Sequence, residues 1–420
     1  MESLAIIGSG IAGLGCAHFL RHHYNITVFE AAAHIGGHSN TRTVSENGHD
    51  IAVDTGFMVY NEVTYPLLTK LFKSLDVPTK PTSMSFSVHH GPSNTEWEGS
   101  GLSGLFAQRK NLLSPSHWRF LSQLNRFNKQ AVEAIDDPQW NGLTIADYVA
   151  RRGYGDTFLH RYLVPMSAAV WSTPPDRMLQ FPAKTLLRFW HNHGFLGLHT
   201  QHPWRTVDGG AREYVSRLTR PFAAQIHTRT PVRSVRRFSS HVEVVTDTST
   251  SAFDRVILAS HADHSLAMLD SPTGPERELL SPFAYQPNKV HLHSDPAIMP
   301  ATRRAWASWN YRTESAAENT THYWMNNLQG VSDKRDYFVS LNAGHRIGDQ
   351  LTHEELDYDH PLFDLPAINA QARLPQLNET TANNRTFFAG SYFRNGFHED
   401  ALRSAHDLAK TILGTDPWEA

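Results

Sequence analysis

The sequence predicts an α/β fold in which a Rossmann-like nucleotide-binding domain is interrupted by an α+β domain inserted in two pieces. The chain opens with a strand, a glycine turn, a helix and a second strand, and similar patterns return twice further along. Long helical segments rich in aromatic residues separate these pieces. We therefore expect a discontinuous nucleotide-binding domain (residues 1–60, 205–265 and 380–420) and a substrate domain (residues 61–204 and 266–379).

The individual elements follow from short-range periodicity. Leu14, Ala17 and Leu20 repeat at helical spacing between the first two apolar runs. The same spacing predicts helices at 117–127, 185–191 and 399–413. Apolar or alternating runs predict strands at 4–7, 26–29, 232–235, 242–245, 255–258 and 387–390.

Composition and charge limit the class of protein. The 420 residues, 40% hydrophobic and 19% charged, are enough for two folded domains. A formal net charge of -3 gives no overall attraction to nucleic acid. The single cysteine, Cys16, excludes an internal disulfide and a multi-cysteine metal site. Without a visible signal peptide or membrane-spanning stretch, we expect a cytoplasmic protein, at most peripheral to the inner face of the membrane.

A dinucleotide-binding motif follows the first expected strand, reading Gly8-Ser9-Gly10-Ile11-Ala12-Gly13. The first glycine permits a tight turn, the second lets the backbone approach a pyrophosphate, and the third lets helix and strand pack closely. Glu30 ends the second strand at the spacing where an acid binds the adenosine ribose. No arginine follows Glu30, which disfavours a 2′-phosphate and therefore NADPH.

The segments beyond Glu30 favour FAD over a nicotinamide cofactor. Gly36-Gly37 can wrap a second turn around the pyrophosphate, and Asp54-Thr55-Gly56 opens another. Near the end of the chain, Ala389-Gly390-Ser391 leads from a strand into a loop, and Gly396 opens the last helix. The N-terminus of that helix can stabilise the flavin edge that becomes negative on reduction. A nicotinamide dehydrogenase would leave this segment unexplained and ranks last.

Several longer strings carry a family resemblance. They are 36–41 (GGHSNT), 54–57 (DTGF), 105–114 (LFAQRKNLLS), 170–175 (VWSTPP), 306–311 (WASWNY), 372–375 (ARLP) and 396–400 (GFHED). With them the chain resembles the flavin amine oxidase superfamily, which includes protoporphyrinogen oxidases and carotenoid desaturases. Within it, the chain looks like the bacterial predicted NAD/FAD-binding proteins related to the N-terminal half of plant cyclopropane fatty-acid synthases. The resemblance implies FAD, a glutathione-reductase-type nucleotide fold and a substrate domain of sheet and helices.

Motifs and resemblance together predict a cofactor site formed by residues near both ends of the chain. His38 stands where the superfamily usually has arginine, and Ala401 where glycine is common. No cysteine lies near Ser391, so FAD is expected to bind without a covalent bond. The expected residues are Gly8, Gly10, Ile11, Ala12, Gly13, Glu30, Gly36, Gly37, His38, Ser39, Asp54, Thr55, Gly56, Phe57, Val232, Gly390, Ser391, Gly396, Phe397, His398 and Ala401.

Three residues are candidates for catalysis. Lys289 falls near the position where relatives keep a lysine that holds a water against the flavin, although a solvated strand lysine is an equal alternative. Phe397 stands where many amine oxidases place an aromatic ring before the flavin, but no partner ring is identifiable from sequence. His398, at the start of the last helix, can relay protons, whereas Glu399 and Asp400 are expected to be dipole partners.

Other polar and aromatic clusters have simpler interpretations. His291 and His293 share a face of an expected strand, as His191 and His193 would if extended, but neither pair has a third ligand, so no metal is expected. Core packing accounts for most of the aromatic cluster between 306 and 324, and one or two of its rings are candidates for a substrate channel.

A basic and apolar stretch at 102–130 hints at the substrate. No acid lies between Glu98 and Glu133, while five basic residues mix with large apolar ones. Such a mixture is typical of peripheral membrane contact. A helix pair with a solvated face is the alternative.

The sequence therefore predicts an FAD-dependent oxidoreductase that transfers hydride at a C–H bond of a fatty-acyl or phospholipid chain, one that can carry a methyl or cyclopropane branch. A lipid or other apolar small molecule is the expected substrate. A flavin amine oxidase acting on a small amine, a flavin-binding accessory protein without turnover, and an isomerase that uses FAD without net redox stay open. The oligomeric state is left open.

Overall fold

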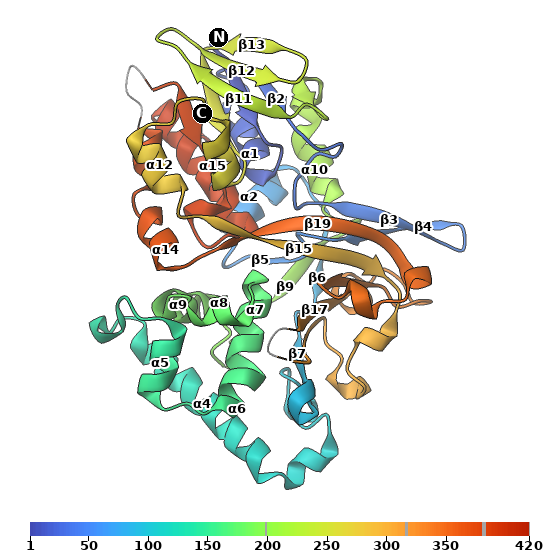
Figure 1. Cartoon of the computed structure of the whole chain (residues 1–420). Helices are drawn as coiled ribbons and strands as arrows, with labels where there is room; N and C mark the ends of the chain where they lie inside the picture. The colour runs from blue at the N-terminus through green and yellow to red at the C-terminus, as the bar shows by residue number, and fades with distance from the viewer. Residues whose placement is uncertain (198–199, 316–317, 380–383, 420) are drawn as a thin grey trace.

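A five-stranded parallel sheet forms the end of the molecule that holds both termini (Figure 1). The computed structural model describes residues 1–197, 200–315, 318–379 and 384–419. In spatial order the strands are β10 (Ile226–His227), β2 (Asn25–Phe29), β1 (Ser3–Ile7), β14 (Arg255–Leu258) and β20 (Thr386–Phe388). The expected strands at 4–7, 26–29 and 255–258 are confirmed, and the last strand ends two residues before Gly390.

Helices from distant parts of the chain cover this sheet. Helix α1 (Ile11–Leu20) packs against α10 (Arg212–Thr219) and α15 (His398–Leu413). The contact with α15 is close, because a Cβ built on Gly15 would lie 3.0 Å from Cβ of Ala405. The C-terminal helix is thereby held beside the first glycine turn.

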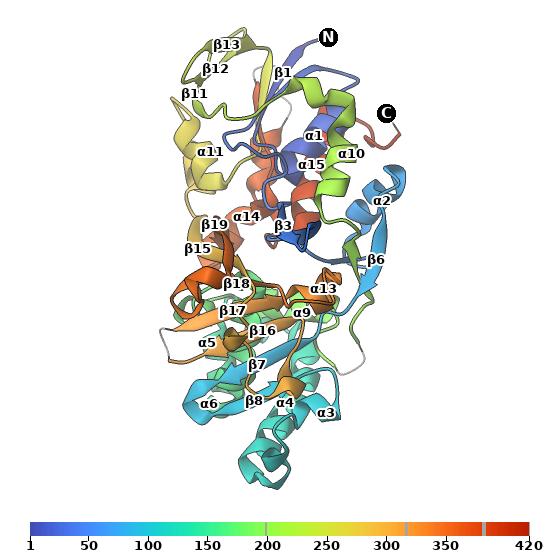
Figure 2. The same cartoon turned by 90° about the vertical axis from the view of Figure 1, so that its right-hand side faces the viewer.

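A seven-stranded sheet forms the middle of the molecule, and its long outer strands pass below the parallel sheet (Figures 1 and 2). All neighbouring strands are antiparallel except β16 and β7. The order is β19 (Thr352–Leu362), β15 (Ala284–His293), β18 (Phe338–Leu341), β17 (Asn319–Trp324), β16 (Trp309–Thr313), β7 (Phe86–His90) and β8 (Thr95–Glu98).

Three small antiparallel sheets complete the strands. They are β11 (Val232–Arg237), β12 (Val242–Thr246) and β13 (Thr250–Phe253); β3 (Thr41–Glu46) and β4 (His49–Asp54); and β5 (Tyr60–Asn61), β9 (Trp204–Val207) and β6 (Thr79–Thr82). The expected strands at 232–235 and 242–245 are confirmed.

A helical layer lies at the end opposite the termini (Figure 1). It comprises α3 (Leu102–Leu105), α4 (Pro115–Ala134), α5 (Ile145–Arg152), α6 (Asp156–Phe158), α7 (Val164–Trp171), α8 (Pro175–Leu179) and α9 (Ala183–Asn192). The remaining helices are α2 (Pro66–Ser74), α11 (Ala262–Met268), α12 (Gly274–Leu280), α13 (Met325–Gln329) and α14 (Leu365–Gln371). The expected helices at 117–127, 185–191 and 399–413 are confirmed, and His191 lies in α9, so the extended alternative for His191 and His193 is wrong.

The parallel sheet unites strands from all three pieces expected to form the nucleotide-binding domain. The domain boundaries themselves stay a prediction, and the one at residue 380 lies outside the described residues. Within the described ranges, no helix is long and apolar enough to cross a membrane.

Candidate active site

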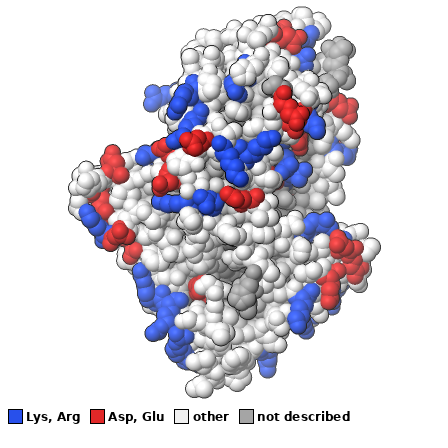
Figure 3. All heavy atoms as spheres, turned by 180° about the vertical axis from the view of Figure 1, so that it is seen from behind, with Lys and Arg blue, Asp and Glu red and all other residues white. Residues whose placement is uncertain are grey.

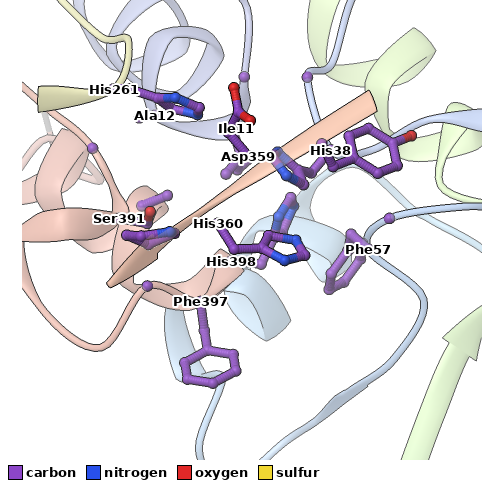
Figure 4. Close-up of a pocket in the computed structure, with 18 of the residues that line it drawn as sticks. Ile11, Ala12, His38, Phe57, His261, Asp359, His360, Ser391, Phe397 and His398 are labelled. Atoms are coloured by element: carbon purple, nitrogen blue, oxygen red, sulfur yellow. The ribbon is translucent and has the colours of Figure 1, made fainter. Parts of the chain in front are cut away.

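A cavity of about 770 Å³ lies between the parallel sheet and the seven-stranded sheet. Its wall combines the first glycine turn, the end of β2, strands β15 and β19, and the start of α15. Figure 4 shows that residues from these distant segments face the same space.

The first glycine turn places backbone at the cavity wall. Gly10 precedes α1, and no described atom lies within 4 Å of a Cβ built there. A Cβ on Gly13 would lie 1.9 Å from the carbonyl oxygen of Gly8, so the third glycine is required by helix–strand packing. Gly8 (φ 104°) and Gly10 line the cavity together with the first residues of α1, Ile11 and Ala12, while Gly13 supports the turn from behind. The free amides of the first helical turn form a site suited to phosphate.

Glu30 stands at the end of β2 on the cavity wall. One carboxylate oxygen accepts from the Ser9 amide at 2.9 Å and the Ser9 hydroxyl at 2.6 Å, and the other accepts from the Ala32 amide at 2.7 Å. These bonds fix the carboxylate beside the first glycine turn. Val232, at the start of β11, lines the same part of the cavity.

The second glycine turn touches the first. A Cβ on Gly37 (φ 58°) would lie 3.1 Å from Cα of Gly10, and the Gly36 amide donates to the Ser9 carbonyl at 3.0 Å. The next residue, His38, stacks on Tyr358 of β19 with ring centroids 4.8 Å apart. Burial lowers the pKa of His38 to about 4, and its buried Nε2 has no hydrogen-bond partner in the described part of the chain.

Besides Gly13, two other expected cofactor residues do not reach the cavity. The buried carboxylate of Asp54 accepts from the Ala211 amide at 2.9 Å and from Gln329, and so supports the start of α10. Ser39 contacts the hydroxyl of Tyr214. Both positions lie behind the wall, because their side chains bond to neighbouring elements. By contrast, Thr55, Gly56 and Phe57 line the cavity, as do Gly390 and Ser391.

His398, the first residue of α15, is fixed on two sides. Its Nε2 lies 2.7 Å from the Tyr214 hydroxyl, and its ring stacks on Phe57 at 3.9 Å. Burial lowers the pKa of His398 to about 3, so the ring is neutral at neutral pH. Gly396, Phe397 and Ala401 line the cavity beside it.

The acids after His398 bond to backbone amides. Glu399 accepts from the Leu67 and Leu68 amides at 3.0 Å, and Asp400 accepts from the Phe397 amide at 3.0 Å. Burial raises the pKa of Asp400 to about 6. These contacts agree with the expectation that both acids are partners of the helix dipole and not catalytic groups.

Lys289 lies outside the cavity, which corrects its expected place beside the flavin. Its side chain is 64% exposed and pairs with Asp357 at 2.7 Å. Its neighbour Val290 lines the cavity instead, because successive side chains of a strand point to opposite faces. On the Lys289 face, the buried His293 ring lies 2.7 Å from the Ser340 hydroxyl.

The other end of the cavity is aromatic. Phe397 stacks on Phe189 of α9 at 4.8 Å and meets Trp171 of α7 edge-on at 6.0 Å. Phe189 in turn stacks on His193 at 3.9 Å. A separation of 4.8 Å is direct ring contact, so Phe397 and Phe189 pack on each other and do not flank an open slot.

Few charged groups face the cavity. Among the described lining residues, Glu30, Arg233 and Asp359 are the only Asp, Glu, Lys or Arg. In the view of Figure 4, Asp359 lies toward Ile11 and Ala12, and Phe397 lies at the other end. Other apolar or aromatic lining residues are Met84, Val170, Phe195, Trp204, Trp309, Tyr323, Leu328 and Leu341.

The family model of flavin containing amine oxidoreductases matches residues 11–330. The chain belongs to this family. As a flavin containing amine oxidoreductase it is an FAD-dependent oxidoreductase, and its FAD is bound without a covalent link.

Solved structures share the fold of this amine oxidoreductase along its whole length. A redesigned putrescine oxidase has a TM-score of 0.69 at 16% identity, covering 98% of this chain and 99% of that one. Cyclohexylamine oxidase from Brevibacterium oxydans IH-35A has a TM-score of 0.70 at 15% identity, with the same coverage. The CLA-producing fatty acid isomerase from P. acnes has a TM-score of 0.66 at 14% identity, covering 97% of this chain and 98% of that one. No curated protein matches the sequence.

The cavity residues of this amine oxidoreductase fit FAD. Open space at Gly10 and the free amides of α1 suit a pyrophosphate, the Glu30 carboxylate suits ribose hydroxyls, and the unpartnered Nε2 of His38 can bond a polar group. Sequence patterns missed Tyr214, Tyr358, Phe189 and Trp171. Their roles arise from contacts between residues such as Tyr214 and His398, 184 positions apart, which no local pattern reports.

Proposed function

We propose that this flavoenzyme transfers hydride at a C–H bond of a fatty-acyl or phospholipid chain, with a methylated or cyclopropanated chain as one candidate. The observation that supports this proposal most strongly is the aromatic and aliphatic end of the cavity, where Phe397 packs on Phe189 and forms an apolar surface. An alkyl chain gains about 0.8 kcal/mol for each CH₂ buried there. A protonated amine would enter without a facing carboxylate at this end.

We assign the cofactor to the glycine turns, Glu30, Val232 and the start of α15. This arrangement also supports a nucleotide domain of glutathione-reductase type. Bound FAD supplies the hydride acceptor or donor. His398 contributes a neutral ring held by Phe57 and Tyr214, which can exchange a proton with the Tyr214 hydroxyl at its Nε2. The surrounding apolar side chains orient the substrate and exclude water.

Two further observations support an acyl substrate. A structural neighbour of this chain is named as a fatty acid isomerase. The motifs quoted above also resemble bacterial proteins related to cyclopropane fatty-acid synthases. Both observations agree with the apolar cavity. Because one neighbour is named as an isomerase, a reaction of this chain without net redox also stays a candidate.

Oxidation of a small amine is the second candidate. Putrescine oxidase and cyclohexylamine oxidase share the fold, and aromatic rings do stand before the start of α15. The direct contact between Phe397 and Phe189 argues against it, because the rings leave no gap for an amine.

Anaerobic titration of the purified holoenzyme distinguishes these candidates. We expect loss of flavin absorbance, or a shifted double bond found by mass spectrometry of the lipid, with acyl chains or phospholipids. Simple amines such as putrescine and cyclohexylamine should leave the spectrum unchanged. Flavin reduction by amines alone would establish the second candidate, and indifference to every lipid and amine would indicate an accessory protein.

A further inference from the structure

Exposed apolar side chains gather in the segment from α3 to the start of α4, and α4 lies at the end of the molecule opposite the termini (Figure 1). Leu113 is 89% exposed, Leu102 75%, Trp118 52% and Leu112 47%. These are four of the eight large hydrophobic residues exposed in the described chain, and all four lie between positions 102 and 118. We call them, with the basic residues Arg109, Lys110 and Arg119, the apolar tip.

Hydrogen bonds and ring contacts order the centre of the apolar tip. The indole nitrogen of Trp118 donates to the Leu112 carbonyl at 2.9 Å, and its ring lies 5.1 Å from Phe106. Arg109 donates to the carbonyl of Phe106 at 2.9 Å. The exposed leucines and tryptophan are therefore presented by an ordered turn at the start of α4.

The charges around the apolar tip are of one sign. Arg109, Lys110 and Arg119 are exposed, and none forms an ion pair with a carboxylate among the described residues. Further along α4, the exposed Arg126 and Lys129 continue the positive surface. Figure 3 shows Lys and Arg, without Asp or Glu, at the lowest part of the molecule on that face.

We propose that the apolar tip docks on the surface of an anionic phospholipid bilayer. Leucine and tryptophan side chains can enter the interface between headgroups and acyl chains, while unpaired cations remain at the level of the phosphates. Large apolar side chains that are exposed together in one short segment, with Leu113 89% exposed, are typical of an interaction surface. Helix α4 packs against α9, which carries Phe189 of the cavity wall, so the docking surface and the cavity share one helical layer.

This inference stands on the exposed surface alone and goes beyond the proposed function. Flotation of the holoenzyme with vesicles of phosphatidylcholine, with or without an equimolar share of phosphatidylglycerol, tests it. We expect binding to the anionic vesicles at low salt and weak binding to phosphatidylcholine alone. Lys110→Glu and Arg119→Glu should each weaken binding at least about fivefold, and Leu113→Ser about tenfold.

Matched controls keep the test decisive. Lys334→Glu and Phe238→Ser change an exposed cation and an exposed apolar ring elsewhere, and should bind as wild type does. Flavin content and thermal midpoint, measured on the same samples, should be equal for all variants, which separates this test from that of the flavin chemistry. Vesicle binding that is absent, or equal in the tip variants, would overturn the proposal. A dimer that Leu113→Ser dissociates would do the same, by assigning the tip to a second copy of the chain.

Discussion

The two ends of the cavity are built in different ways. The nucleotide end presents backbone, placed by Gly8, Gly10, Gly36 and Gly37, with Glu30 as its principal charged side chain. The aromatic end presents side chains from α7, α9, α15 and the seven-stranded sheet, which meet only in the folded molecule. A backbone-built site is specified by local spacing, whereas a side-chain-built site is specified by tertiary packing. The first end should therefore be sensitive to an added methyl group, and the second to a removed ring.

The largest expected effect separates two glycines of one turn. Gly13→Ala places a Cβ 1.9 Å from the Gly8 carbonyl oxygen, and we expect a loss of about 4 kcal/mol or more of stability. Gly10→Ala meets no described atom within 4 Å and should have the thermal midpoint of the wild type when both are deflavinated, yet fail to hold FAD because the methyl group faces the cofactor space. Denaturant unfolding and flavin content measure the two outcomes. Equal flavin content in Gly10→Ala and wild type would show that the backbone at Gly10 does not face the cofactor.

Removal of a ring should alter the aromatic end alone. Phe189→Ala deletes the stacking partner of Phe397 and should cost about 3 kcal/mol of stability. The nucleotide end should keep its FAD. The space vacated beside Phe397 should admit small amines, so we expect slow flavin reduction by cyclohexylamine where wild type shows none. Flavin loss from this variant, with the fold intact, would show that the two ends are not separable.

Acid should destabilise the protein through histidines that the fold keeps neutral. His38, His398 and His360 have pKa values lowered by burial to about 4, about 3 and about 3. Between these values and about pH 6.5, the unfolded chain binds more protons than the folded one, so stability falls as pH falls. Each such group adds a slope of about 1.4 kcal/mol per pH unit. Denaturant unfolding from pH 7 to pH 5 measures the slope, which should be shallower in His398→Phe. A flat profile would contradict neutral burial.

The smallest expected effect concerns the hydrogen bond between Tyr214 and His398. Tyr214→Phe removes the hydroxyl 2.7 Å from Nε2 of His398 and should cost about 1 kcal/mol of stability. FAD should remain bound, while the pH profile of flavin reduction should move, because His398 loses its partner. An unchanged pH profile would limit Tyr214 to a structural role.

Local sequence patterns specified much of the fold and the nucleotide end. The glycine turns, Glu30, Phe57 and the start of α15 follow from motifs within a few residues, and all reach the cavity. Lys289 was wrongly expected beside the flavin, because a position in a strand does not tell which face of the sheet lines the cavity. Asp54 and Ser39 were expected to contact the cofactor, but their side chains bond to the start of α10 and to Tyr214. The partner ring of Phe397 could not be found, since Phe189 lies more than two hundred positions away in sequence and meets it only through packing.

Segments near both ends of the chain hold one FAD in one cavity, and the proposals above depend on this arrangement. Titration of the deflavinated protein with FAD and with FMN measures it. We expect one FAD bound per chain, released intact on denaturation, and much weaker binding of FMN because Glu30 and the first glycine turn then lack their ligand. A colourless purified protein that takes up no FAD, or one that binds FMN equally well, would contradict it.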